Sequence, residues 1–179
     1  DTELDKVYPV INGEGSDSAM LDNSLEFMMM AGMDLPLAVM VTIPEPWQGD
    51  KTISRTKRDL YQYYAILMEP WDGPASILFS DGDVVGAVLD RNGLRPSRYY
   101  VTSDDRLILS SEVGVLDIPA DRIVEKSRLQ PGRMLLVDTR AGRIIGDEAL
   151  KETYAARQPY GEWLDGNLLS LSDLPLPNH

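Results

Sequence analysis

The residues with the clearest potential to bind a charged ligand form a short glycine-flanked stretch, Gly15-Ser16-Asp17-Ser18. Asp17 precedes a run with helical periodicity, and its carboxylate could accept charge-assisted hydrogen bonds from the ammonium group of an amino acid. The alternative is structural, because Ser and Asp are preferred N-cap residues and could serve only to bind the first N–H groups of the helix. The local sequence by itself favours capping.

A second polar cluster surrounds the dipeptide Asn92-Gly93. It contains three arginines, which are Arg91, Arg95 and Arg98. Their guanidinium groups could bind a carboxylate or phosphate, or they could pair with nearby acids such as Asp72, Asp90 and Glu112. Because Asp and Glu outnumber Lys and Arg by 29 to 17, we expect internal ion pairs. Asn92-Gly93 itself favours a type I′ turn, in which both central residues have positive φ.

The groups that most enzymes use for covalent or metal-dependent catalysis are missing from the sequence. It contains no cysteine, and its one histidine is His179 in the C-terminal tail. A thiol nucleophile is therefore absent, and a Ser-His-Asp triad or a histidine zinc site is nearly excluded. There is also no phosphate-binding loop and no dinucleotide fingerprint. We predict no catalytic residue, no metal ligand and no cofactor in this chain.

Hydrophobic periodicity predicts helices first and then antiparallel hairpins, which is the order of an α+β domain. Helices are expected from about Ser16 to a stop at Gly32, then at 35–42, 52–68 and 147–157. In the third helix Lys57 is expected on the exposed face and Leu67 on the buried one. The expected strands are 75–79, 84–89, 99–102, 107–109, 134–137 and 143–145. We assign 1–157 to one domain and 158–179 to a linker or tail.

Composition narrows the class of protein and its partners. The net charge is −12, which argues against nucleic acid binding because phosphate contacts need clustered Lys and Arg. No apolar run approaches the roughly 20 residues of a membrane span, and the acidic start at Asp1 is unlike a signal peptide. A cytoplasmic location and the absence of membrane contact are the default expectations.

Several stretches together resemble the class II glutamine amidotransferase domain of the glutamate synthase large subunit. The resemblance extends from about Asn12 to Leu164, and its blocks occur in the same order. They are Gly15-Ser16-Asp17-Ser18 with Leu21-Asp22-Asn23, Ile43-Pro44-Glu45-Pro46-Trp47, Glu69-Pro70-Trp71-Asp72-Gly73-Pro74, Arg91-Asn92-Gly93-Leu94-Arg95-Pro96, Ser111-Glu112-Val113-Gly114 and Pro131-Gly132-Arg133-Met134.

The resemblance implies part of an αββα N-terminal-nucleophile fold in which a cysteine hydrolyses glutamine to glutamate. The released ammonia then converts 2-oxoglutarate to a second glutamate. The whole enzyme is expected to use FMN, an iron–sulfur cluster and NAD(P)H or ferredoxin. In this family the aspartate of the Ser-Asp-Ser block holds the α-amino group of glutamine, so Asp17 becomes the expected substrate-binding residue.

The family's nucleophilic cysteine, its carboxylate-binding arginine and its oxyanion-hole residues belong to segments upstream of Asp1. We therefore expect this piece to be inactive alone, and to depend on the missing N-terminal part and on the other domains of the enzyme. A sheet sandwich without its first strands exposes a sheet surface, through which a homo-oligomer could also form. The alternative is a non-catalytic scaffold or regulatory module with the same fold.

Overall fold

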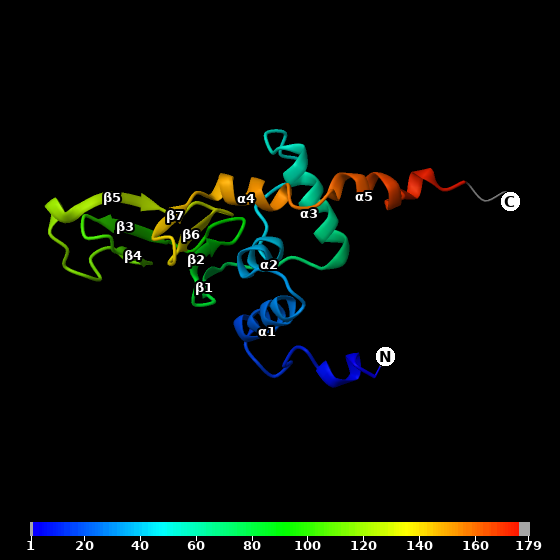
Figure 1. Ribbon diagram of the computed structural model, residues 1–179, viewed down its shortest axis with the longest axis horizontal. Coiled ribbons are helices and arrows are strands. Elements are labelled where there is room, and N and C mark those ends of the chain that lie inside the picture. The colour runs from blue at the N-terminus through cyan, green and yellow to red at the C-terminus, as the bar shows by residue number, and fades with distance from the viewer. Residues whose placement is uncertain (1, 176–179) are drawn as a thin grey trace.

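The computed structural model describes residues 2–175 and contains two antiparallel sheets with helices gathered on one side (Figure 1). The helices are α1 (Asp17–Met30), α2 (Leu35–Thr42), α3 (Arg55–Leu67), α4 (Asp147–Ala155) and α5 (Tyr160–Asn167). The strands are β1 (Ser76–Ser80), β2 (Val84–Leu89), β3 (Arg98–Thr102), β4 (Leu107–Ser110), β5 (Ile123–Arg128), β6 (Met134–Asp138) and β7 (Arg143–Ile145). Short 3₁₀ turns lie at Leu4–Val7, Ala120–Arg122 and Leu171–Asp173. His179 lies outside the described residues.

The larger sheet has the strand order β1-β2-β6-β7, and every neighbouring pair is antiparallel. Side chains alternate between its two faces, as the period of a strand requires. Val88 and Leu136 point to the helices and join the main core, whereas Leu89 and Leu135 point to the second sheet. The sheet is therefore apolar on both faces and separates two layers of structure.

The smaller sheet has the order β4-β3-β5 and packs on the larger one through a second apolar cluster. That cluster joins Leu89 and Leu135 of the larger sheet to Leu129, and Tyr99 and Leu109 of the smaller sheet pack against it. In Figure 1 the smaller sheet forms the left-hand end of the molecule, on the side away from the helices. The layer order is thus helices, sheet, sheet, which agrees with the predicted α+β class and with three layers of an αββα sandwich.

The main core lies between the larger sheet and the helices, and α2 is its centre. All eight residues of α2 are buried, because the helix is covered by α1, α3 and the sheet. Gly32, with φ +93°, lies just beyond the end of α1 as predicted. A left-handed residue at that position costs glycine little, and it turns the chain from α1 into α2.

Three details differ from the sequence-based expectations. Lys57 is buried in α3, and Leu67 is 60% exposed, so these two side chains lie in the opposite environments from those predicted. Strand β5 was not predicted, because its charged sequence lacks the apolar pattern of a strand. Helix α5 was not predicted either; it packs on α3 through Tyr160 and Trp163, which contact Tyr63 at centroid distances of 5.2 and 5.3 Å. The proposed domain boundary at 157/158 stays a prediction.

Candidate functional site

The block that contains Asp17 forms the N-terminal end of α1. Ser16 is the N-cap, and its Oγ accepts a hydrogen bond from the backbone N–H of Ala19 at 3.3 Å. The preceding loop is fixed to the helix, since the N–H of Asn12 donates to Oδ1 of Asn23 at 3.1 Å. Asp17 is the first helical residue and is exposed. Ser16 therefore performs the capping function, and the Asp17 carboxylate is open to solvent.

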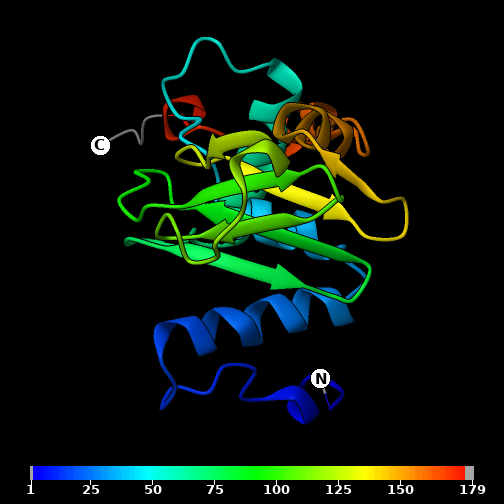
Figure 2. The ribbon, with the colours of Figure 1, turned by 90° about the vertical axis from the view of Figure 1, so that its left-hand side faces the viewer.

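A groove of about 790 Å³ runs between α1 and β1. In Figure 2 the helix lies along the strand, below the edge of the sheet. The groove is lined by Ser18, Asp22 and Glu26 among the polar residues of α1, and by the whole of β1. Asp17 directly precedes Ser18, the first of these helical residues, but does not itself line the groove.

The edge of β1 that faces this groove has no strand partner within the described residues. The backbone O of Ala75 accepts from the N–H of Asp90 at 3.1 Å, which fixes the alternation of hydrogen-bonded pairs along β1 and β2. Ser76 and Leu78 consequently point their N–H and C=O groups away from β2, towards the open edge. Such an edge can accept a further strand.

Asp90 joins three segments that belong to other blocks of the resemblance. It is 3% exposed, and its carboxylate accepts from the N–H groups of Ala75, Asn92 and Gly93 at 2.9–3.1 Å. Its backbone O also accepts from the N–H of Gly132 at 3.1 Å. These bonds satisfy the oxygens of a buried carboxylate and position three loops, so this junction is structural.

The turn at Asn92-Gly93 is not of type I′. Gly93 has φ +60°, but Asp105 is the one described non-glycine residue with positive φ. The turn is instead closed by the N–H of Gly93 bonding to the O of Asp90 at 3.0 Å. The carboxylate of Asp90 also accepts from the N–H of Asn92, two residues further on, and so helps to fix the turn. A Cβ on Gly93 would lie 2.5 Å from Cγ of Pro131, so glycine is required there by packing as well as by φ.

The expectation that the three arginines near this turn form ion pairs is met in one case. Arg91 pairs with Asp72 at 3.1 Å. No ion pair involves Arg95 or Arg98 in the part of the chain that the structure describes. Asp90, which was a candidate partner, uses its carboxylate for backbone N–H groups instead.

A cluster of six charged residues lies behind this junction, and sequence reasoning did not anticipate it. The cations are Lys57, Arg133 and Lys151, and the anions are Glu45, Asp147 and Glu148. The cluster joins the loop after α2 to α3, α4 and β6. Equal numbers of opposite charges make it neutral overall, and that balance is what allows two lysines to be buried.

The contacts within this six-charge cluster are close. Nζ of Lys151 lies 2.9 Å from Oδ1 of Asp147 and 3.3 Å from Oε2 of Glu45, and it donates to the O of Gly132 at 2.8 Å. Nζ of Lys57 lies 2.6 Å from Oε1 of Glu148. The hydrogen bond from Lys57 lowers the pKa of Glu148 below its usual value. Each cation of the cluster thus contacts at least one carboxylate, which points to a structural role.

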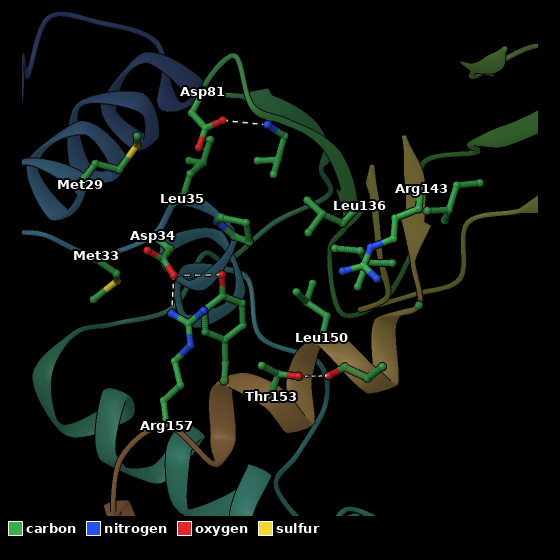
Figure 3. Close-up of a pocket in the computed structure, with 17 residues that line it drawn as sticks. Met29, Met33, Asp34, Leu35, Asp81, Leu136, Arg143, Leu150, Thr153 and Arg157 are labelled. Atoms are coloured by element: carbon green, nitrogen blue, oxygen red, sulfur yellow. Dashed lines mark hydrogen bonds and ion pairs between the residues drawn. The ribbon is translucent and has the colours of Figure 1, made fainter. Parts of the chain in front are cut away.

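A second cavity, of about 780 Å³, lies between α2, α4 and the larger sheet (Figure 3). Asp34 accepts from the hydroxyl of Tyr154 at 3.3 Å and pairs with Arg157. Burial raises the pKa of Tyr154 to about 12, so the hydroxyl stays protonated at neutral pH and keeps donating. This contact ties the start of α2 to the end of α4. The cavity adjoins the α1–β1 groove, because Met29 and Leu35 line both.

The described residues contain no group of three or more acids or histidines that could hold a metal ion. Within the same residues, none of the helices has the length and apolar composition needed to cross a membrane. The site residue predicted from sequence is thus exposed at a helix N-terminus beside a groove, while the blocks around Asp90 form the frame behind it.

Comparison with known proteins gives a consistent result along the chain. The family model for class-II glutamine amidotransferases matches residues 1–163. The chain is 50% identical to the glutamate synthase [NADPH] large chain of Bacillus subtilis over 97% of its length and 11% of that relative. It is 52% identical to the glutamate synthase [NADH] of Schizosaccharomyces pombe, over 96% of the chain and 8% of the relative. Against ferredoxin-dependent glutamate synthase 2 of Synechocystis the identity is 44%, over 90% and 10%. The chain thus spans about a tenth of the length of these relatives.

Proposed function

The chain belongs to the class-II glutamine amidotransferases, and we propose that it forms part of the glutaminase domain of a glutamate synthase. In this proposal the whole protein hydrolyses glutamine to glutamate and passes the ammonia to 2-oxoglutarate, which is reduced to a second glutamate. The three relatives named above are glutamate synthases that match the chain almost from end to end. Their similarity supports this activity over that of other amidotransferases.

Asp17 is the residue that we propose binds the substrate, through the α-ammonium group of glutamine. The observation that carries this proposal is the exposed Asp17 carboxylate beside the groove, with Ser16 rather than Asp17 acting as the cap. A carboxylate bound to an ammonium group forms a charge-assisted hydrogen bond, which contributes about 1.5–3 kcal/mol. A ligand held there would extend along the groove between α1 and β1.

The nucleophile of the reaction has to come from residues outside this sequence, because the sequence contains no cysteine. Two features support the packing of further polypeptide here. One is the open edge of β1. The other is the exposed part of the larger sheet's second face, where Leu78 is 64%, Val85 46% and Ile144 42% exposed. We propose that the nucleophile-bearing segment packs at this edge and face.

The cofactors of the whole protein follow from the same proposal. The relatives' names include NADPH, NADH and ferredoxin, and we propose that electrons come from one of these donors. The present residues do not fit an iron–sulfur cluster, whose usual ligands are cysteine thiolates. FMN and the cluster are therefore proposed for other domains. The cytoplasmic location and a homo-oligomer formed through the exposed sheet both stay predictions.

The substitution Asp17→Asn in the full-length synthase tests the role of this carboxylate. We expect kcat/KM for glutamine to fall roughly 10–150-fold, which corresponds to the loss of about 1.5–3 kcal/mol of binding. Activity with added ammonia in place of glutamine should not change, because that reaction bypasses the glutaminase site. Asp5→Asn, which removes another exposed acid, is the control and should alter neither activity.

The alternative function, a non-catalytic scaffold, makes a different prediction for the same variant. If Asp17 is only a surface acid, Asp17→Asn should leave glutamine-dependent and ammonia-dependent rates unchanged. That result would remove Asp17 from the site. If the wild-type protein lacked glutamine-dependent activity but kept ammonia-dependent activity, the glutaminase proposal itself would be wrong.

A further inference from the structure

The second cavity, between α2, α4 and the larger sheet, has no part in the proposed function, and we call it the α2–α4 cavity. Its volume of about 780 Å³ lies in the range of small-molecule sites, which are mostly apolar with a few polar groups. It shares Met29 and Leu35 with the α1–β1 groove, but Ser18, Asp22 and Glu26, the polar residues of that groove, do not line it. The cavity is therefore a candidate site of its own.

Arg143 places a free cation on one wall of the α2–α4 cavity. Ile145, two residues further along β7, packs against the main core, so Arg143 points to the same, helix-covered side of the sheet. Figure 3 shows its guanidinium group directed towards Leu136 and Leu150, which also line the cavity. The chain has 12 more acids than bases, yet within residues 2–175 no ion pair and no side-chain hydrogen bond uses Arg143.

The opposite wall of the cavity carries the ion pair of Asp34 with Arg157 (Figure 3). Both partners of the Asp34 carboxylate, the hydroxyl of Tyr154 and the guanidinium of Arg157, contact Oδ2. The other oxygen, Oδ1, has no partner in the part of the chain that the structure describes. Figure 3 shows this oxygen on the side of Met29 and Met33, which also line the cavity. The cavity thus presents a free cation on one wall and a free carboxylate oxygen on the other.

We propose that the α2–α4 cavity binds an aliphatic zwitterion whose ammonium and carboxylate groups lie at opposite ends of a methylene chain. The carboxylate pairs with Arg143, whose planar guanidinium can donate two parallel hydrogen bonds to it. The ammonium group donates to Oδ1 of Asp34. The methylene chain packs on apolar lining residues such as Leu136 and Ile145. Arg157 keeps its contact with Oδ2 of Asp34, so the wall does not have to rearrange.

Charge balance favours a zwitterion over a simple anion or cation. Two acids, Asp34 and Asp81, and two arginines line the cavity, so its formal charge is zero. Asp81 already accepts, through Oδ1, from the N–H groups of Asp83 and Val84 at 2.9 Å. A monoanion would be attracted by Arg143 but repelled by both acids, and a monocation would meet the reverse. A molecule with both charges on one carbon could not reach both walls.

Saturation-transfer NMR, observed on the ligand and carried out with the full-length synthase, tests the proposal. The probes are γ-aminobutyrate, ε-aminohexanoate and ω-aminooctanoate, whose increasing length measures the span between the two walls. Each probe is compared with the isomer that carries both charges on one carbon, such as norleucine for ε-aminohexanoate. Composition and net charge are then equal, and only the separation of the charges differs. Hexanoate and hexylamine test the two charges separately.

Two variants change the cavity in different ways. Arg143→Gln removes the free cation, and Ala149→Phe fills the cavity from α4 while it keeps the arginine. Both positions are exposed, so both variants should fold, which urea unfolding checks. The control is Arg140→Gln, which removes the same charge from the same β6–β7 turn. Arg140 is 78% exposed, pairs with Asp83 and does not line the cavity.

We expect one chain length to bind best, about tenfold or more tightly than its isomer, hexanoate or hexylamine. Arg143→Gln and Ala149→Phe should each weaken the binding of that probe by about tenfold or more, because each removes a charge-assisted hydrogen bond or the space for the chain. Arg140→Gln should bind it as the wild type does. Asp17→Asn should also bind it unchanged, so a failure of the proposed glutamine site would leave this test intact.

Three results would overturn the proposal. One is the absence of saturable binding of all three probes to the wild type. Another is equal affinity of the best probe for the wild type and for Arg143→Gln. The third is binding that is lost in Asp17→Asn and kept in Arg143→Gln, which would place the probe in the α1–β1 groove instead.

Discussion

The substitution Lys151→Met tests whether the six-charge cluster stabilises the fold. The side chain of Lys151 is 3% exposed, and its ammonium group contacts Asp147, Glu45 and the O of Gly132. Methionine keeps most of the apolar stem but removes the charge. The cluster then carries one excess negative charge, and the O of Gly132 loses its donor. Removal of one partner from a buried ion pair costs about 3–5 kcal/mol, mainly because the remaining charge is left without compensation.

The magnitude should lie within this range rather than above it. Arg133 is 45% exposed and also contacts Glu45 and Asp147, at 3.7 and 2.7 Å. It can therefore move towards the vacated position and offset part of the excess charge. A loss of 3–5 kcal/mol in a chain of this length corresponds to a fall of roughly 6–20 °C in Tm.

Urea unfolding followed by tryptophan fluorescence measures this loss directly. Trp47 stacks on Tyr61 at 6.3 Å between ring centroids, and the hydroxyl of Tyr61 donates to Glu45 at 3.1 Å, so the signal reports on the surroundings of the cluster. Lys51→Met, at an exposed lysine, is the matched control and should change the free energy of unfolding by less than about 0.5 kcal/mol.

A double-mutant cycle separates electrostatic coupling from loss of packing. In Glu45→Gln/Lys151→Met the excess negative charge is removed, so the double variant should lose at least about 1 kcal/mol less than the sum of the two single variants. A cost below about 1 kcal/mol for Lys151→Met, or strict additivity in the cycle, would refute the reasoning that the cluster is a coupled, charge-balanced unit.

Two further substitutions test the packing of Gly93 against Pro131 and the loss of stability at low pH. Gly93→Ala should destabilise the fold by about 1–3 kcal/mol more than Gly142→Ala. Both glycines have φ near +60°, but an added Cβ would meet Pro131 only at Gly93. The urea midpoints of the two variants measure the difference, and equal losses would show that packing against Pro131 is unimportant. The pKa of Glu148 lies below its ordinary value of 4.5 in the folded state, mainly because of the hydrogen bond from Lys57. The stability that this bond contributes is therefore complete above about pH 4.5 and is lost as pH falls through the lower, folded pKa. In Glu148→Gln the free energy of unfolding should therefore decrease less steeply below that pH than in the wild type. An equally steep decrease in both proteins would contradict the assignment.

The sequence predicted the elements whose pattern is local. Helix α2 has the predicted bounds, and α1 ends where Gly32 was expected to stop it. The hairpins β1–β2, β3–β4 and β6–β7 also form at the predicted turns, because alternating apolar residues flank short polar segments in each. These signals depend on neighbours within a few residues, and they can therefore be recognised without knowledge of the fold.

The features that were missed depend on partners far away in the sequence. Lys57 was expected on the exposed face of α3, since periodicity treats lysine as a surface residue. Its burial is made possible by Glu148, which is 91 residues away. Strand β5 has no apolar alternation, and it forms because it pairs with β3. The position of Asp17 beside a groove likewise depends on the packing of α1 along β1, for which the local sequence holds no signal.

The recognisable blocks of the sequence therefore divide into two physical classes. Asp90, Gly93 and Gly132 are restricted by contacts with other parts of the chain: a buried carboxylate bound to three N–H groups, and two glycines whose Cβ positions are occupied by neighbouring loops. Asp17 has no such restriction, because its carboxylate is exposed and the capping function belongs to Ser16. Asn at position 17 removes only the interaction of a carboxylate with the first turn of α1, which contributes at most about 1 kcal/mol. Asp17→Asn should thus reduce the use of glutamine strongly while the free energy of unfolding falls by no more than about 1 kcal/mol, and this separation distinguishes a binding residue from a structural one.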